Sequence, residues 1–119
     1  MNRTLFMTVY KRGDILLVPF PFSDQTATKK RPAVVVSANM YNDGSNDIVI
    51  MAVTSRIEKP VGIGECLIRD WEVAGLLKPS AIKAAISTIE QKLVLKKLGG
   101  LSPVDMSSME NALKKLLGL

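Results

Sequence analysis

The sequence of 119 residues contains no histidine and only one cysteine. Without histidine, the chain has no imidazole for acid–base catalysis near neutral pH and none for the usual zinc sites. A single cysteine, Cys66, excludes both an intrachain disulfide and a cysteine metal cluster. Its position in ECLI predicts a small buried hydrophobic side chain. We therefore expect no metal or other cofactor, and a reducing compartment.

Long apolar runs and nucleotide-binding motifs are also missing. No run approaches the roughly 18 residues of a membrane-spanning helix. The first residues have no signal-peptide core or cleavage site, so we expect a cytoplasmic protein with no membrane partner. There is no GxxxxGK[ST] loop and no GxSxG elbow, and GIG at 62–64 lacks the third glycine of a dinucleotide fold. Asp43 and Asp47 lie four residues apart, but no partner motif makes them a metal site.

Basic charge is present in excess and is unevenly distributed. The chain has 16 Lys and Arg against 11 Asp and Glu, a net charge of +5. Residues 1–37 hold six cations against two carboxylates, 38–77 three against six, and 78–119 seven against three. Two basic flanks favour a polyanionic partner, although solvated lysines alone would explain the charge equally well. The length predicts a single domain over 1–119.

Apolar runs predict a series of short strands. The run at 13–20 is long enough for a strand buried on both faces, ended by Pro19 and Pro21. A polar loop follows at 21–30, and loops of that length in small domains are often functional. Further strands are predicted at 33–37, 48–55, 61–68 and 81–89, with a turn at 38–47.

The C-terminus predicts a helix. Ser102 and Asp105 have the spacing of a capping box, and Pro103 suits the first helical position. Apolar residues then recur every three or four positions, and Gly118 is a stop signal. Five or more strands with a terminal helix predict a mostly β fold with helices, a small antiparallel barrel or curled sheet.

The residues left for chemistry are cations and hydroxyls at strand ends. An arginine guanidinium offers a phosphate two parallel donors and keeps its charge. RNA supplies its own nucleophile, the 2′-hydroxyl, so a protein need only orient it and stabilise charge. Each residue also has a structural interpretation: Arg31 could protect a strand edge, and Thr54 could be a β-former. The candidates are Lys29, Lys30, Arg31, Ser37, Thr54, Ser55, Arg56, Ser80 and Lys83.

Four segments together resemble the PemK/MazF-like toxins of bacterial toxin–antitoxin pairs. They are RGDILLVPFPFSD (12–24), KKRPAVVVSAN (29–39), IVIMAVTSRI (48–57) and LLKPSAIKAAISTIEQKLVLKKLGGLS (76–102), followed by the closing helix. Gly-Asp at the first strand, Arg-Pro at the second and a threonine ending the third are the most specific features. The resemblance implies an SH3-like or CcdB/Kid-type barrel, usually a homodimer, that cleaves single-stranded RNA at short sequences without a metal.

The resemblance also assigns roles to individual residues. It implies that Arg31 contacts the scissile phosphate and takes part in proton transfer, and that Thr54 stabilises the pentavalent phosphate. It implies RNA contacts at Ser80 and Lys83. We expect further RNA binding from Lys29, Lys30, Ser37 and Arg56. Many relatives carry polar residues where this chain has 83–87, so the recognition sequence is not carried over.

Three functions remain open from the sequence. The first is a translation-inhibiting endoribonuclease, restrained by a cognate acidic antitoxin that folds on binding. The second is an RNA-binding barrel with weak catalysis, which would bind RNA in a salt-sensitive manner without cutting it. The third is a toxin that inhibits DNA gyrase, which would leave RNA intact and damage DNA.

Overall fold

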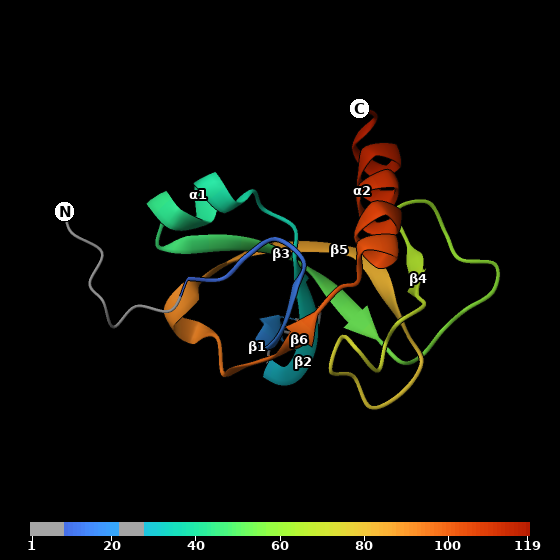
Figure 1. Cartoon of the computed structure of the whole chain (residues 1–119), viewed down its shortest axis with the longest axis horizontal. Coiled ribbons are helices and arrows are strands. Elements are labelled where there is room, and N and C mark those ends of the chain that lie inside the picture. Colours follow the sequence, from blue (N-terminus) through green and yellow to red (C-terminus); the bar gives the residue numbers. More distant parts are fainter. Residues whose placement is uncertain (1–8, 22–27) are drawn as a thin grey trace.

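Six strands form one antiparallel, curled sheet in the order β4-β5-β3-β2-β1-β6 (Figure 1). The computed structural model describes residues 9–21 and 28–119. Its strands are β1 (Asp14–Pro21), β2 (Thr28–Val35), β3 (Asp47–Thr54), β4 (Cys66–Ile68), β5 (Ser80–Glu90) and β6 (Lys96–Gly100). Its helices are α1 (Asn39–Gly44), the 3₁₀ helix η1 (Gln91–Leu93) and α2 (Pro103–Leu117). The predicted curled sheet with a terminal helix is confirmed.

The sheet has a packed apolar layer on each face. Along β1, Ile15 belongs to the layer that also contains Met109 of α2, whereas Leu16 belongs to the layer that contains Ile48. Both β1 side chains are fully buried. Neighbouring residues of a strand point to opposite faces, so an uninterrupted apolar run suits a strand covered on both sides. This confirms the expectation for the first strand.

The prediction that Pro19 and Pro21 end the first strand is wrong for Pro19, whereas Pro21 is the last residue of β1. Strand β1 continues to Pro21, and Pro19 pairs with Lys30 of β2. The Leu17 carbonyl accepts a hydrogen bond from Leu95, on the β6 side of β1. Pro19 and Pro21 lie two and four residues after Leu17, so their nitrogens face the same side of β1 as the Leu17 carbonyl. The pairing of β1 with β6 has already ended at Leu17. The prolines therefore remove no ladder hydrogen bond.

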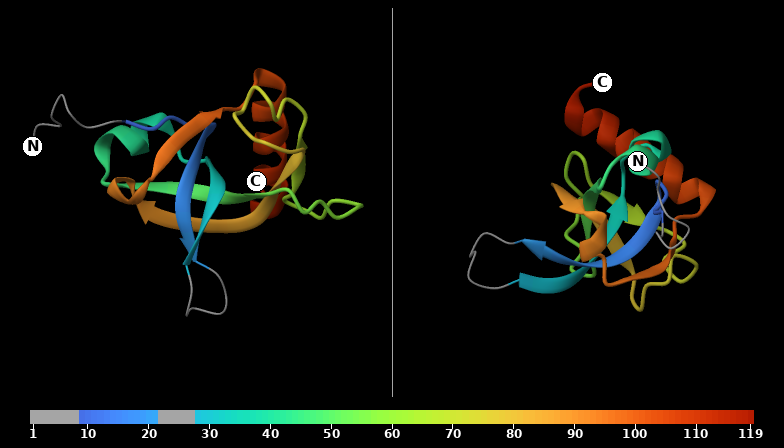
Figure 2. Two further views of the ribbon diagram at one scale, coloured as in Figure 1. Left: turned by 90° about the horizontal axis from the view of Figure 1, so that it is seen from below. Right: turned by 90° about the vertical axis from the view of Figure 1, so that its left-hand side faces the viewer.

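The loop expected at 21–30 is shorter than predicted. Residues 22–27 lie outside the described residues, but Pro21 and residues 28–30 belong to strands. Strand β2 begins at Thr28 rather than at 33, so Lys29, Lys30 and Arg31 are strand residues. Figure 2 shows β1 and β2 extending together as an arm from the rest of the sheet. The cations therefore lie along this arm, at alternating faces.

The turn expected at 38–47 contains a short helix instead, α1. A buried polar network ties this helix to the sheet. Asn42 is fully buried, donates to the Ser37 carbonyl and accepts from the Ser37 hydroxyl. The amide nitrogen of Gln91, also buried, donates to the Asn42 carbonyl at 2.8 Å. Buried polar groups need such partners, and here Ser37 is close in sequence whereas Gln91 comes from a distant part of the chain.

The later strands differ from prediction in length and number. The strand expected at 61–68 covers only Cys66–Ile68, and the strand at 81–89 is confirmed as β5. Strand β6 was not predicted, because two lysines and two glycines in KKLGG carry no strand signal. A bulge interrupts the β3–β5 ladder: Met51 pairs with Ile86 and Val53 with Ile82, so three residues of β5 face one of β3.

Helix α2 begins and ends as predicted. The Ser102 hydroxyl accepts a hydrogen bond from the Asp105 amide at 3.3 Å, and Gly118 adopts a left-handed conformation. In a capping box the Asp105 carboxylate would accept the Ser102 amide. The buried Asp105 carboxylate instead accepts the amides of Arg69 and Asp70. It fixes the chain after β4 to the helix. No helix in the described part of the chain is long and apolar enough to cross a bilayer.

Candidate functional site

One cavity of about 510 Å³ brings together residues from β1, β2, β3, β5, β6 and the β4–β5 connection. We call it the cationic pocket. Its lining includes both residues that the resemblance made catalytic, Arg31 and Thr54. The complete lining is Leu17, Arg31, Pro32, Val53, Thr54, Ser55, Gly75, Leu77, Lys78, Ser80, Lys96 and Leu98. The structure therefore places Arg31 and Thr54 at one site, while their catalytic roles remain predictions.

Strand register explains why Arg31 and Thr54 meet. Strands β2 and β3 are antiparallel neighbours, and their pairing ends with Ala33 opposite Ala52. Arg31 and Thr54 each lie two residues beyond that last pair. Side chains two residues apart share a face, so both belong to the same face at the same end of the sheet. Arg31 and Thr54 are 23 positions apart in sequence but adjacent in register.

Two glycines fix one wall of the pocket, where the β4–β5 connection meets β6. Gly75 has a φ of +83°, and a Cβ there would lie 2.0 Å from the Leu98 carbonyl oxygen. A Cβ at Gly99 would lie 2.5 Å from the Ala74 carbonyl oxygen. The β4–β5 connection and β6 therefore touch backbone to backbone, which only glycine permits. This contact sets the position of Leu77 and Lys78 at the pocket.

The charges of this pocket are all positive among the described residues. Its lining contains Arg31, Lys78 and Lys96 and no carboxylate. Sequence reasoning missed Lys78 and Lys96 as site residues. The KPS segment that includes Lys78 was a possible signal, but Lys96 reaches the site only because β6 pairs with β1, where it lies opposite Leu17. A lining that contributes three cations favours binding of an anion.

Two of the three hydroxyl residues that line the pocket, Thr54 and Ser80, are in different hydrogen-bonding states. The Thr54 hydroxyl accepts a bond from the Arg56 amide at 3.0 Å, so its O–H remains available as a donor. The Ser80 hydroxyl, in contrast, donates to the Lys78 carbonyl at 2.8 Å. A donor at Thr54 is suited to an anionic oxygen, whereas Ser80 offers a ligand its lone pairs only.

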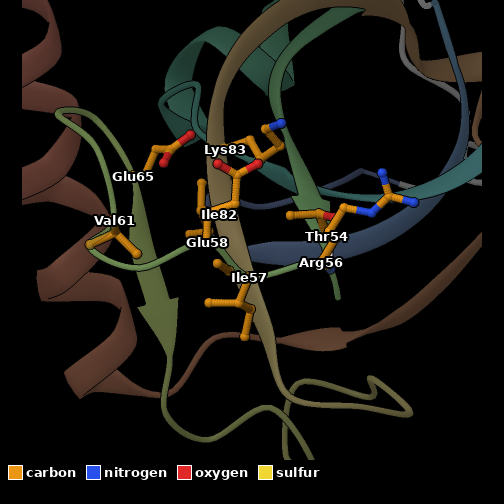
Figure 3. A pocket seen from close by; sticks show the side chains of 9 residues that line it. Thr54, Arg56, Ile57, Glu58, Val61, Glu65, Ile82 and Lys83 are labelled. Atoms are coloured by element: carbon orange, nitrogen blue, oxygen red, sulfur yellow. Dashed lines mark hydrogen bonds between the residues drawn. The ribbon is translucent and has the colours of Figure 1, made fainter.

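A second, smaller cavity of about 80 Å³ adjoins the first and shares Thr54 with it (Figure 3). We call it the mixed-charge pocket because it combines two cations with two carboxylates. Its lining is Thr54, Arg56, Ile57, Glu58, Val61, Glu65, Ala81, Ile82 and Lys83. Two of the expected RNA-binding residues, Arg56 and Lys83, therefore lie here rather than in the cationic pocket.

Three other expected RNA-binding residues lie in neither pocket. Lys29 and Lys30 are exposed on the arm formed by β1 and β2. The Ser37 hydroxyl accepts the Val49 amide at 3.0 Å, five residues before Thr54 on β3, which separates it from the cationic pocket by about 17 Å. Its hydroxyl also donates to Asn42. Ser37 thus has a structural role here, and its RNA contact remains a prediction.

The cysteine and the carboxylates offer little chemistry elsewhere. Cys66 is partly buried rather than fully buried, and packs against the core beneath α2. Burial, with a smaller contribution from the Asp105 carboxylate, raises its pKa to about 11, so the thiol stays protonated at neutral pH. Among residues 9–21 and 28–119, no cluster of three or more metal-ligating side chains occurs.

The Gly-Asp pair of the first strand is structural. Gly13 has a φ of +92°, and a Cβ there would lie 2.1 Å from the Met106 methyl group of α2. The Asp14 carboxylate accepts the Lys11 amide at 2.8 Å and pairs with Lys97 of β6 at 3.3 Å. Both residues hold β1, β6 and α2 together, which supports the pocket without lining it.

Solved structures with the same fold are found among bacterial toxins. An endoribonuclease from mycobacterial species superposes with a TM-score of 0.76 at 21% identity, covering 96% of each chain. A mycobacterial endoribonuclease in complex with its cognate antitoxin gives 0.74 at 20% identity, covering 92% of this chain and 96% of that one. MazF from Deinococcus radiodurans gives 0.74 at 18% identity, covering 95% and 100%.

Identities this low establish the shared fold alone, so membership of a family depends on the sequence itself. Residues 11–117 match the family described as PemK-like, MazF-like toxin of type II toxin–antitoxin system. The match spans every strand and helix of the structure, including the Arg-Pro and threonine segments that line the cationic pocket. The chain therefore belongs to the PemK-like, MazF-like toxin family of type II toxin–antitoxin systems.

Proposed function

We propose that this protein is a metal-independent endoribonuclease toxin that cuts single-stranded mRNA and so inhibits translation and growth. The observation that carries the proposal is the cationic pocket, in which Arg31 and Thr54 share a cavity with two lysines. The lining has the chemistry of a phosphodiester site, because permanent cations and a hydroxyl donor bind and polarise phosphate oxygens. Family membership points to the same class of activity.

The proposed reaction uses the RNA's own nucleophile. The 2′-hydroxyl attacks the adjacent phosphorus and loses its proton, and the bond from phosphorus to the 5′-oxygen breaks. The departing oxygen gains a proton, leaving a 2′,3′-cyclic phosphate on one fragment and a 5′-hydroxyl on the other. Arg31 holds the phosphate and acts on the side of the leaving oxygen rather than as the base, because a guanidinium has N–H donors and no acceptor for the 2′-hydroxyl proton. Thr54 donates its O–H to a non-bridging oxygen.

The other cations extend the site along the RNA backbone. Lys78 and Lys96 line the same cavity and bind flanking phosphates in this proposal. Lys29 and Lys30 are exposed on the adjoining arm and continue the positive surface. Backbone contacts of this kind position a nucleic acid, and base contacts select the sequence.

Cleavage of a long RNA in the presence of EDTA tests the proposal. We expect discrete cuts whose downstream fragments carry 5′-hydroxyl ends, unchanged by the chelator. Arg31→Ala is expected to abolish cutting, and Arg69→Ala, which removes an exposed arginine outside both pockets, is expected to leave it unchanged. Equal rates for Arg31→Ala and the unaltered protein would overturn the assigned site.

The same assay separates the alternatives. Salt-sensitive RNA binding without any cut would identify an RNA-binding barrel of lost activity. Intact RNA together with DNA breaks in the presence of gyrase would identify a gyrase inhibitor. Either result would replace the endoribonuclease proposal.

We propose two protein partners, an acidic antitoxin and a second copy of this chain. A carboxylate-rich segment is complementary to the cationic pocket, whose lining in the described residues has no acid of its own. A structurally similar endoribonuclease was solved with its cognate antitoxin. The homodimer follows from the family resemblance, and sedimentation is expected to give twice the 13.0 kDa chain mass.

A further inference from the structure

The two adjacent pockets differ in charge although they share Thr54. The cationic pocket holds three cations and, within the described residues, no carboxylate. The mixed-charge pocket holds Glu58 and Glu65 beside its cations. A phosphate is attracted to the first and repelled by carboxylates in the second. The two pockets are therefore suited to different parts of one ligand.

A local irregularity of the sheet brings Lys83 to the mixed-charge pocket. Lys83 is the first of three β5 residues that face only Ala52 of β3, because the ladder shifts between Met51 and Val53. Such bulges change the direction of side chains and occur frequently next to active sites. Ser80, the first residue of β5, lines the cationic pocket and Ala81, the next residue, lines the mixed-charge pocket, so the start of this strand borders both cavities.

The carboxylates come from the other side of this pocket. Glu65 is held in place, because one of its oxygens accepts the Gly62 amide at 3.0 Å. Glu58 has no hydrogen bond or ion pair within the described part of the chain. Figure 3 shows Glu58 and Glu65 reaching into the region of Lys83, while the guanidinium of Arg56 extends away from both carboxylates. The pocket thus presents acceptors and a donor together.

We propose that the mixed-charge pocket recognises a guanine base next to the scissile phosphate. The Watson–Crick edge of guanine has one acceptor, O6, followed by two N–H donors, N1–H and the 2-amino group. Glu58 accepts from both donors and Lys83 donates to O6. Among the four RNA bases only guanine offers two adjacent donors, which a carboxylate can accept in parallel. At about 80 Å³ the cavity suits the edge of one base, not a whole nucleotide.

This inference rests on the proposed endoribonuclease function and adds its sequence preference. Thr54 donates to the phosphate at the boundary of the two pockets, so the base that enters the mixed-charge pocket belongs to a nucleotide that flanks the cut. Glu58 and Lys83 are therefore specificity residues, and the phosphate chemistry does not need them.

Mapping of cleavage ends gives the first test. Ends produced by the unaltered protein on a long RNA are expected to show guanine at one fixed position beside the cut. A short RNA with that sequence, and a copy with inosine in place of this guanine, then isolate the 2-amino group. Inosine lacks one of the two donors, so cleavage is expected to fall about 10-fold. Absence of guanine from every flanking position, or equal cleavage of the inosine copy, would overturn the proposal.

A substitution of Glu58 gives the second test. Glu58→Gln keeps the size of the side chain but replaces one acceptor with a donor, so guanine is expected to lose its advantage and cuts are expected at other bases. Glu72→Gln, in the exposed β4–β5 connection, is the matched control and is expected to keep the guanine preference. A Glu58→Gln protein with an unchanged set of cut sites would contradict the assignment.

Binding without cleavage separates this inference from the proposed function. The probe is the same short RNA with a 2′-deoxy sugar at the scissile nucleotide, which removes the nucleophile. Glu58→Gln is expected to weaken binding of the guanine probe about 10-fold and to equalise it with the inosine probe. If the unaltered protein cuts no RNA at all, the proposed function is wrong. If it cuts RNA and binds both probes equally, only the guanine assignment is wrong.

Discussion

The two ends of β3 use similar polar residues for different purposes. At the start of the strand, Ser37, Asn42 and Gln91 are hydrogen-bonded to one another or to nearby backbone. At the end of the strand, Thr54 keeps a free O–H donor and borders two cavities. A hydroxyl or amide whose donors are satisfied inside the protein stabilises the fold, whereas one with a donor left over can bind a ligand. The two ends of β3 therefore differ less in residue type than in whether the polar donors are already hydrogen-bonded within the protein.

Of the changes at the two ends of β3, removal of the free donor is expected to have the largest effect. Thr54→Val keeps the shape and β-propensity of the side chain but deletes the O–H, so RNA cleavage is expected to fall about 100-fold, the scale of one transition-state donor. Initial rates on a defined RNA measure the change. Thr88→Val, at an exposed threonine of β5, is expected to cleave normally. A similar loss in both variants would show that the effect is not specific to the pocket.

At the other end of β3, the expected change is in stability. Asn42→Ala removes a fully buried amide and leaves the Ser37 groups without their partner, which is expected to cost about 2 kcal/mol of unfolding free energy. Urea denaturation measures this cost, with the exposed Asn46→Ala as the control. Cleavage per folded molecule is expected to stay unchanged. Reduced cleavage by a folded Asn42→Ala protein would remove the distinction between the two ends.

The lysines of the cationic pocket are expected to give a smaller effect, visible in salt dependence. Each phosphate contact contributes about 0.7 to the slope of log affinity against log salt for a single strand. Lys78→Ala and Lys96→Ala are each expected to lower that slope by about this amount in RNA-binding titrations. Lys92→Ala, outside both pockets and paired with Glu90, is expected to leave the slope unchanged. Equal slopes for all three variants would place the RNA elsewhere.

The last prediction concerns Cys66, which lies outside both pockets and is expected to have the smallest effect on function. Its pKa of about 11 lies well above that of a free thiol, so little thiolate exists at pH 8 and alkylation by iodoacetamide is expected to be about 100-fold slower than in urea-unfolded protein. Because the native state holds this proton more tightly, unfolding stability is expected to decrease as the pH rises from about 9 towards 11. Rapid alkylation of the folded protein would contradict the assigned burial.

Some elements of the fold could be predicted from local sequence patterns, whereas others depend on contacts between distant residues. The strands at 13–20, 48–55 and 81–89 and the terminal helix were predictable, because apolar patterns and capping residues act between neighbours in sequence. The short helix α1 was missed, because Asp43-Gly44 resembles a turn and the helix is held by Gln91, about 50 residues away. Strand β6 was missed because it is created by pairing with β1 and by the close contact at Gly99.

The sequence by itself determined that this chain has no histidine, no intrachain disulfide and an excess of cations, and its resemblance to a toxin family predicted Arg31 and Thr54 as a pair. Tertiary structure alone decided which other charges join them. Lys96 reaches the cationic pocket because β6 pairs with β1. Lys78 reaches it because of the glycine contact between the β4–β5 connection and β6. In the mixed-charge pocket, Glu58 lies beside Lys83. Register and backbone packing are long-range properties, so no local pattern could place these groups.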